Sequence, residues 1–183
     1  MAARERAFTA PTVQLLTPTG ELRPTPEAEP YLPLVEALSD DVLERFYRDM
    51  VVSRRLDVAG ANLQRQGQLA LWVPSHGQEA AQVGSGFAAK PQDHIFPSYR
   101  EHIVGMIRGL DPVNILSLLR GATLGGWNPA ENGNFHLYTL VLGSQTLHAT
   151  GYAMGITLDG LSGTGDPTKD EAVIVYFGDG PTS

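Results

Sequence analysis

The sequence predicts an α/β protein with a doubly wound, mostly parallel sheet. Segments of helical periodicity alternate with short apolar runs, the order typical of successive β–α–β units. The last run, residues 172–177, is rich in β-branched and aromatic side chains and is expected to be a strand buried on both faces. It stops at Gly178-Asp179-Gly180, and open α/β sheets bind ligands at the carboxyl ends of their strands.

Composition narrows the possible functions. The chain has 183 residues, of which 42% are hydrophobic and 18% charged, as in ordinary globular proteins. A net charge of −7 argues against a nucleic-acid partner, because phosphate backbones need a basic face. The absence of cysteine excludes disulfides, thiolate metal sites and a cysteine nucleophile. No signal peptide and no apolar run near the roughly 20 residues that span a bilayer is present, so we expect a cytoplasmic protein without a membrane partner.

Residues 1–36 are expected to form an extended, Pro-rich N-terminal arm, and residues 37–183 the domain. Six of the thirteen prolines precede residue 34, and proline interrupts regular helices and strands. Residues 13–20 can be interpreted as a short strand and turn, or as an arm that becomes ordered only against a partner surface.

The first long helix is expected to run from an N-cap at Ser39 to about Gln66, before Gly67. Apolar residues recur on it at three- and four-residue spacing and are expected to pack on the core: Val42, Leu43, Phe46, Tyr47, Met50 and Val51.

Shorter elements follow in alternation. We expect a helix over 77–87, a strand over 94–96, and helices over 101–108 and 112–120 that end at Gly109 and Gly121. A loop over 125–134, a strand over 135–142, a helix from 143 to about 158 and a polar connector over 159–170 precede the last strand.

Three loop features carry possible chemistry. Tyr99-Arg100 follows a strand, where a guanidinium can grip phosphate with two hydrogen bonds; a salt bridge from Arg100 to Glu79 or Glu101 is the alternative. The segment 142–145 lies between the predicted strand and helix. Its backbone groups can contact a flat heterocycle there, and a plain turn without a ligand is the alternative. Gly178-Asp179-Gly180 suits a hard cation or a phosphate group, but a lone motif of this kind is common in turns.

Other familiar motifs are missing. The sequence has no Walker-type phosphate loop, no G-x-G-x-x-G after a strand, no H-E-x-x-H and no G-x-S-x-G. The five histidines have no metal-ligand spacing.

Taken in order, five segments resemble the α subunit of the E1 component of 2-oxo acid dehydrogenase complexes. They are NLQRQG at 62–67, GQEAA at 77–81, FPSYRE at 96–101, GSQTLHATG at 143–151 and FGDGPTS at 177–183. The resemblance extends from about residue 40 to the end. It implies the thiamine-diphosphate-binding fold, with thiamine diphosphate and Mg²⁺ as cofactors.

The resemblance also implies roles for single residues. Tyr99 and Arg100 would contact the aminopyrimidine side and the diphosphate, and Leu142 and Leu140 would offer backbone groups to the aminopyrimidine. Asp179 would be a magnesium ligand, with Gly178 and Gly180 beside the diphosphate. His102 and His136 match catalytic positions near the reacting centre.

The chain also departs from the family. A second metal-binding segment, which contains Asn, has no counterpart after Gly178-Asp179-Gly180, so we expect a domain that is incomplete at its C-terminus and inactive alone. The segment between His136 and Gly143 looks short, which makes the match at Leu140 uncertain. Pro181 stands where small residues are usual.

The implied function is oxidative decarboxylation of pyruvate or a branched-chain 2-oxo acid, with acyl transfer to the lipoyl domain of E2. The implied partner is an E1 β subunit in an α2β2 assembly. Two alternatives stay open: a non-catalytic module that pairs with an E1-type partner, and the α subunit of acetoin dehydrogenase. The identity of the 2-oxo acid stays open as well.

Overall fold

The computed structural model describes residues 11–182, in two compact units, Met1–Arg45 and Phe46–Ser183, each described here by itself. The first part of the predicted arm, residues 1–10, lies outside the described residues, as does Ser183. No helix within residues 11–182 is long and apolar enough to cross a membrane.

The N-terminal unit is more ordered than the extended arm that the prolines predict. Leu16 and Leu22 form an antiparallel bridge across a turn, as in the strand-and-turn alternative. A 3₁₀ helix, η1 (Pro26–Tyr31), and a short helix, α1 (Leu32–Glu36), follow. The prediction of an extended arm is therefore wrong for residues 26–36. Each helix has a proline in its first turn, where the missing N–H costs nothing and the fixed φ suits a helix.

Helix α2 (Asp40–Arg65) confirms the predicted long helix, and Gly67, which follows its end, has a positive φ of +72°. The predicted core face is right for only half of its residues. Val42, Phe46 and Met50 are half-buried, whereas Leu43, Tyr47 and Val51 are exposed. The side of α2 that is buried carries small and polar residues: Ser53, Asp57 and Gly60. This side of α2 is buried against the segment that follows the helix. The large ring of Trp72 lies against Gly60, so there is no room for a side chain at that position.

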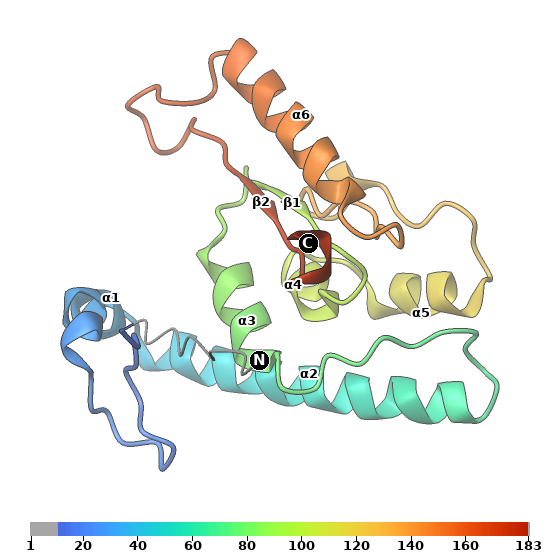
Figure 1. The fold of residues 1–183 in the computed structure, drawn as a ribbon, viewed down its shortest axis with the longest axis horizontal. Coiled ribbons are helices and arrows are strands. Elements are labelled where there is room, and N and C mark those ends of the chain that lie inside the picture. The colour runs from blue at the N-terminus through green and yellow to red at the C-terminus, as the bar shows by residue number, and fades with distance from the viewer. Residues whose placement is uncertain (1–10, 183) are drawn as a thin grey trace, which may run out of the picture. The chain divides into compact units, whose positions relative to one another are not determined.

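The sheet consists of β1 (His94–Phe96) and β2 (Val173–Val175), which pair in parallel (Figure 1). On the other side of β1, Phe135 makes one parallel bridge to Ile95. The parallel pairing agrees with the predicted fold class, and the sheet of the described residues is two-stranded rather than doubly wound.

Two strand predictions need correction. The run at 172–177 forms a strand only over Val173–Val175 and is half-buried, because it has a neighbour on one side only. The strand predicted over 135–142 is wrong beyond the single bridge at Phe135. Phe135 is buried there and Tyr138 packs against the core, whereas residues 140–142 are all exposed, so burial does not alternate as a strand requires.

The other helices confirm their predictions within a few residues. They are α3 (Glu79–Ala88), α4 (His102–Ile107), α5 (Pro112–Arg120) and α6 (Ser144–Leu158). Asp111 caps α5 by accepting a hydrogen bond from the Val113 N–H at 2.8 Å. Helix α3 packs on α4, and α6 packs against both strands (Figure 1).

The core of the second unit lies around β1. Ile95, Val104, Ile115 and Phe135 are buried together with Trp127, whose indole N–H donates to the Phe135 carbonyl. This packing fixes β1, and with it the loop that follows β1.

Candidate functional site

A cleft of about 320 Å³ opens where both strands end. Its walls come from the loop after β1, the loop after β2, the turn before α6 with the first turn of that helix, and the residue that precedes α3. The lining residues are Gln78, Ser98, Tyr99, Arg100, Glu101, Leu142, Gln145, Phe177, Gly178, Asp179, Gly180 and Pro181. The parallel pairing of β1 and β2 makes their carboxyl ends meet at this edge, as expected for a ligand site in an α/β protein.

Arg100 brings an unpaired cation to the cleft. Within residues 11–182 its guanidinium has no hydrogen bond or ion pair, and its buried Nε lacks any acceptor. The guanidinium carbon lies 5.7 Å from the Tyr99 ring centroid. The predicted alternative, a salt bridge to Glu79 or Glu101, is wrong. Glu79 pairs with Arg54 at 2.6 Å, which holds the pKa of that carboxyl at about 2, and Glu101 accepts from Ser98 and from the Arg100 backbone.

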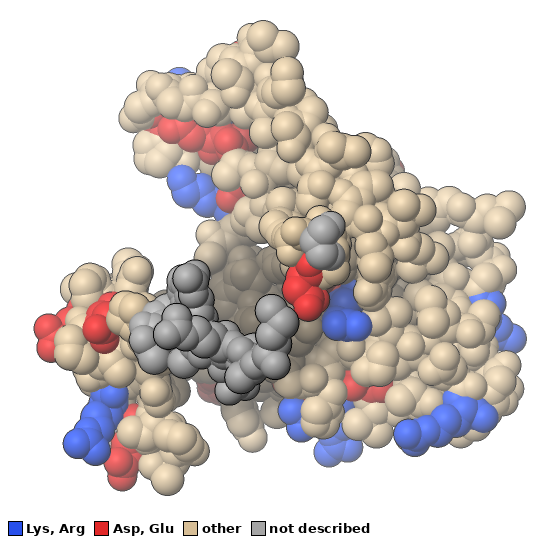
Figure 2. Space-filling view, in the orientation of Figure 1, with Lys and Arg blue, Asp and Glu red and all other residues tan. Residues whose placement is uncertain are grey.

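Asp179 also lines the cleft, on an exposed turn after β2. Its Oδ1 accepts the Gly180 N–H at 3.0 Å, and its backbone carbonyl accepts the Thr182 hydroxyl at 2.6 Å. Gly178 and Gly180 have open space where a Cβ would stand, so a ligand can approach the backbone closely. Acidic and basic surfaces lie next to each other beside the C-terminal segment (Figure 2).

Asp179 alone offers few metal ligands. No group of three His, Cys, Asp or Glu side chains within the described residues can hold a metal ion. A cation here would need oxygen atoms from its ligand or from solvent as well, which is the usual situation for Mg²⁺ bound with a phosphate group.

Gln145 is a residue that sequence reasoning left without an individual role. It lies in the first turn of α6, is 1% exposed and donates from Nε2 to the Tyr176 carbonyl at 2.9 Å. Its Oε1 is buried without a donor within the described chain, although the side chain lines the cleft. The sequence signal for such a role is a polar residue just after a strand-to-helix turn.

Of the remaining predicted residues, Leu142 lines the cleft, whereas Leu140, His102 and His136 do not. Leu140 is 64% exposed. His102 is 1% exposed and held by protein partners: Nδ1 lies 2.6 Å from the Tyr138 hydroxyl and Nε2 3.1 Å from the Val73 carbonyl. Burial lowers the pKa of His102 to about 4, so the imidazole is neutral near pH 7.

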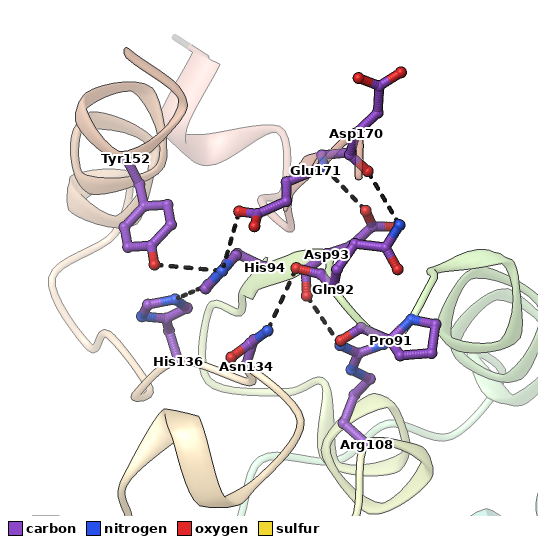
Figure 3. A network of polar contacts seen from close by, with 11 residues as sticks. Pro91, Gln92, Asp93, His94, Arg108, Asn134, His136, Tyr152, Asp170 and Glu171 are labelled. Carbon is purple, nitrogen blue, oxygen red and sulfur yellow. Dashed lines mark hydrogen bonds and ion pairs between the residues drawn. The ribbon is translucent and has the colours of Figure 1, made fainter. Parts of the chain in front are cut away.

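His136 belongs to a separate polar network (Figure 3). Its ring stacks on Phe96 at 3.8 Å between centroids, and its Nε2 lies 3.2 Å from Nδ1 of His94. The other ring nitrogen of His94 lies 3.3 Å from the Tyr152 hydroxyl and 3.8 Å from a Glu171 oxygen. Burial, with a smaller effect of His94, lowers the pKa of His136 to about 4. The structure therefore joins His136 to α6 and to the start of β2 rather than to the cleft.

The cleft thus gathers Tyr99, Arg100, Leu142, Gly178, Asp179 and Gly180, and leaves out Leu140, His102 and His136. An unpaired guanidinium, a carboxylate and small residues around a cavity of this size suit an anionic ligand that carries a metal ion. The catalytic roles of the two histidines stay predictions.

Comparisons with known proteins show which family and which sequences the chain is similar to. Residues 47–183 match the model of the family described as dehydrogenase E1 component. A 3-methyl-2-oxobutanoate dehydrogenase subunit alpha from Mycobacterium tuberculosis is 39% identical over 172 residues, which are 93% of this chain and 42% of that relative.

Two pyruvate dehydrogenase E1 component subunits alpha are also similar. The one from Bacillus cereus is 35% identical over 94% of this chain and 42% of its own length. The one from Bacillus subtilis is 32% identical over 80% of this chain and 37% of its own length. The chain thus spans about two fifths of the relatives that it matches.

Proposed function

Because the chain belongs to the dehydrogenase E1 component family, we propose that it is the N-terminal part of an E1 α subunit of a 2-oxo acid dehydrogenase, and that its cleft holds thiamine diphosphate with Mg²⁺. The complete protein would decarboxylate pyruvate or a branched-chain 2-oxo acid and pass the acyl group to the lipoyl domain of E2. Its partner would be an E1 β subunit in an α2β2 assembly.

The observation that carries the proposal is the unpaired guanidinium of Arg100 in the cleft. A buried donor without a partner is costly, and a diphosphate oxygen would satisfy it with a charged hydrogen bond. Asp179 supplies a carboxylate oxygen of the kind that Mg²⁺ prefers, and diphosphate oxygens would complete much of the coordination. The residues present therefore fit a magnesium diphosphate group.

The chain's own residues would hold and orient the cofactor. Arg100 would bind the diphosphate, Gly178 and Gly180 would let the backbone approach it, and the Leu142 backbone would face the aminopyrimidine ring. When bound, thiamine diphosphate supplies the nucleophilic carbon and the electron sink for decarboxylation. The protein would contribute position and a site with little water.

Calorimetric titration of the chain with thiamine diphosphate and Mg²⁺ tests the proposal. We expect Arg100→Met to weaken binding by roughly 10- to 100-fold, the effect of one charged hydrogen bond or two. Asp179→Asn is expected to weaken binding and to remove most of its dependence on Mg²⁺. Arg120→Met and Asp159→Asn change charge at exposed positions outside the cleft and serve as matched controls. Equal binding by all four variants would refute the proposed site.

Substrate choice is tested with the complete subunit and its β partner. We expect carbon dioxide release from pyruvate or 3-methyl-2-oxobutanoate in the presence of both cofactors. No release from any 2-oxo acid would contradict the proposed activity.

A further inference from the structure

Glu101 is a buried carboxylate without a cation. The residue is 8% exposed and lines the cleft, and no ion pair reaches it within residues 11–182. Burying a carboxylate is costly unless strong donors replace the lost water. The hydrogen-bond donors to the Glu101 carboxylate therefore indicate the role of this side chain.

All of these donors belong to the loop that carries Tyr99 and Arg100. Oε2 of Glu101 accepts the Ser98 N–H at 2.8 Å, the Ser98 hydroxyl at 2.9 Å and the Arg100 N–H at 3.3 Å. Backbone N–H groups that converge on one point form an anion-binding concavity in many phosphate sites, and the N–H groups of Ser98 and Arg100 converge in this way. Here the chain's own carboxylate occupies it.

The other face of the loop is also held. The Arg100 carbonyl accepts from Gln82 Nε2 at 3.2 Å and from the His102 N–H at 2.8 Å. Gln82 in turn accepts the Ile103 N–H through Oε1 at 3.2 Å. Both the N–H and the carbonyl of Arg100 thus make hydrogen bonds, whereas its guanidinium makes none within residues 11–182.

We propose that Glu101 is a positioning residue for the ligand of the cleft. It folds residues 98–101 so that the side chains of Tyr99 and Arg100, and not the loop amides, meet the anion. The nature of that anion rests on the proposed function, but the folding of the loop by Glu101 does not. The role needs one oxygen that accepts both N–H groups, and it does not need a negative charge. Glutamine offers its carbonyl oxygen to the same two N–H groups and an amide donor to the Ser98 hydroxyl.

The comparison of Glu101→Gln with Glu101→Ala tests this. Amide hydrogen exchange followed by NMR reports the Ser98 and Arg100 N–H groups, with the core amide of Ile95 as the reference for global opening. We expect Glu101→Ala to speed exchange at Ser98 and Arg100 at least tenfold relative to Ile95, and Glu101→Gln to keep the wild-type ratio. Glu79→Ala removes an equally buried carboxylate whose backbone partner is Gly77, and is expected to leave this ratio unchanged.

Titration with inorganic pyrophosphate and Mg²⁺ gives the second measurement. We expect Glu101→Ala to bind about tenfold more weakly than wild type, and Glu101→Gln to bind at least as well, because a negative charge has left the cleft. If Glu101 were a metal ligand, Glu101→Gln would weaken binding as much as Glu101→Ala does, and the positioning role would be overturned.

The two hypotheses fail in different ways. If wild type binds no pyrophosphate but Glu101→Ala still frees the Ser98 and Arg100 amides, the loop-folding role stands and the proposed cofactor site falls. If these amides exchange alike in wild type and Glu101→Ala, the positioning role is refuted whatever the chain binds.

Discussion

Substitution of Gly60 tests how α2 packs against the segment that contains Trp72. A Cβ at Gly60 would stand 2.2 Å from two atoms of the Trp72 ring. Trp72 is 3% exposed, and its indole N–H donates to Oδ1 of Asp57 at 3.1 Å. The same oxygen accepts the Ser75 N–H at 2.8 Å, so the ring has little freedom to move aside.

The size of the effect follows from these contacts. Overpacking costs about 1–3 kcal/mol, and breaking the buried hydrogen bond to the Asp57 carboxylate adds about 1.5–3 kcal/mol. Against this, alanine gains about 1 kcal/mol over glycine in a helix. We therefore expect Gly60→Ala to lower the free energy of unfolding by roughly 2–5 kcal/mol, measured by urea unfolding followed by circular dichroism.

Gly84 provides the matched control. It lies in α3, and no atom stands within 4 Å of its ideal Cβ position. Gly84→Ala should raise the free energy of unfolding by up to about 1 kcal/mol through helix propensity alone. A Gly60→Ala variant as stable as wild type would refute the reasoning about Trp72, as would equal losses in both variants.

Two further predictions concern a turn and the response to acid. Gly133 and Gly163 both have positive φ, but a Cβ at Gly133 would stand 2.5 Å from the Arg108 carbonyl oxygen, whereas Gly163 faces open space. Gly163→Ala should cost about 1–2 kcal/mol from the left-handed conformation alone. Gly133→Ala should cost clearly more in the same urea assay, and similar losses would show that Arg108 moves aside without penalty. The second concerns His102, whose folded pKa of about 4 lies below its usual 6.5. Below pH 6.5 the unfolded chain binds a proton that the folded chain refuses, so stability falls as pH falls from 6.5 towards 4, by up to about 1.4 kcal/mol per pH unit. His102→Gln should flatten the dependence measured by urea unfolding between pH 4 and 7, and an unchanged slope would contradict the role of burial.

The helices were predictable because their signals are local. The strand at His94–Phe96 and the helices after it have caps, glycines and prolines within a few residues of their ends, and the structure places the ends close to those signals. The prediction of a strand over 135–142 was wrong because a run of apolar residues does not by itself determine which of them are buried. Phe135 and Tyr138 reach the core, while Leu140 and Leu142 stay exposed.

Sequence alone also placed most of the cleft, because residues that follow parallel strands meet at one edge of the sheet. Tyr99, Arg100 and Asp179 come together on that basis. The partners of each side chain were decided only by the tertiary structure. It pairs Glu79 with Arg54, turns Glu101 to the backbone of its own loop and leaves the Arg100 guanidinium unpaired. The Arg54–Glu79 pair joins residues 25 positions apart and depends on how α2 and α3 pack, and the turn of Glu101 depends on the packing that fixes its loop, so no local pattern encodes either contact.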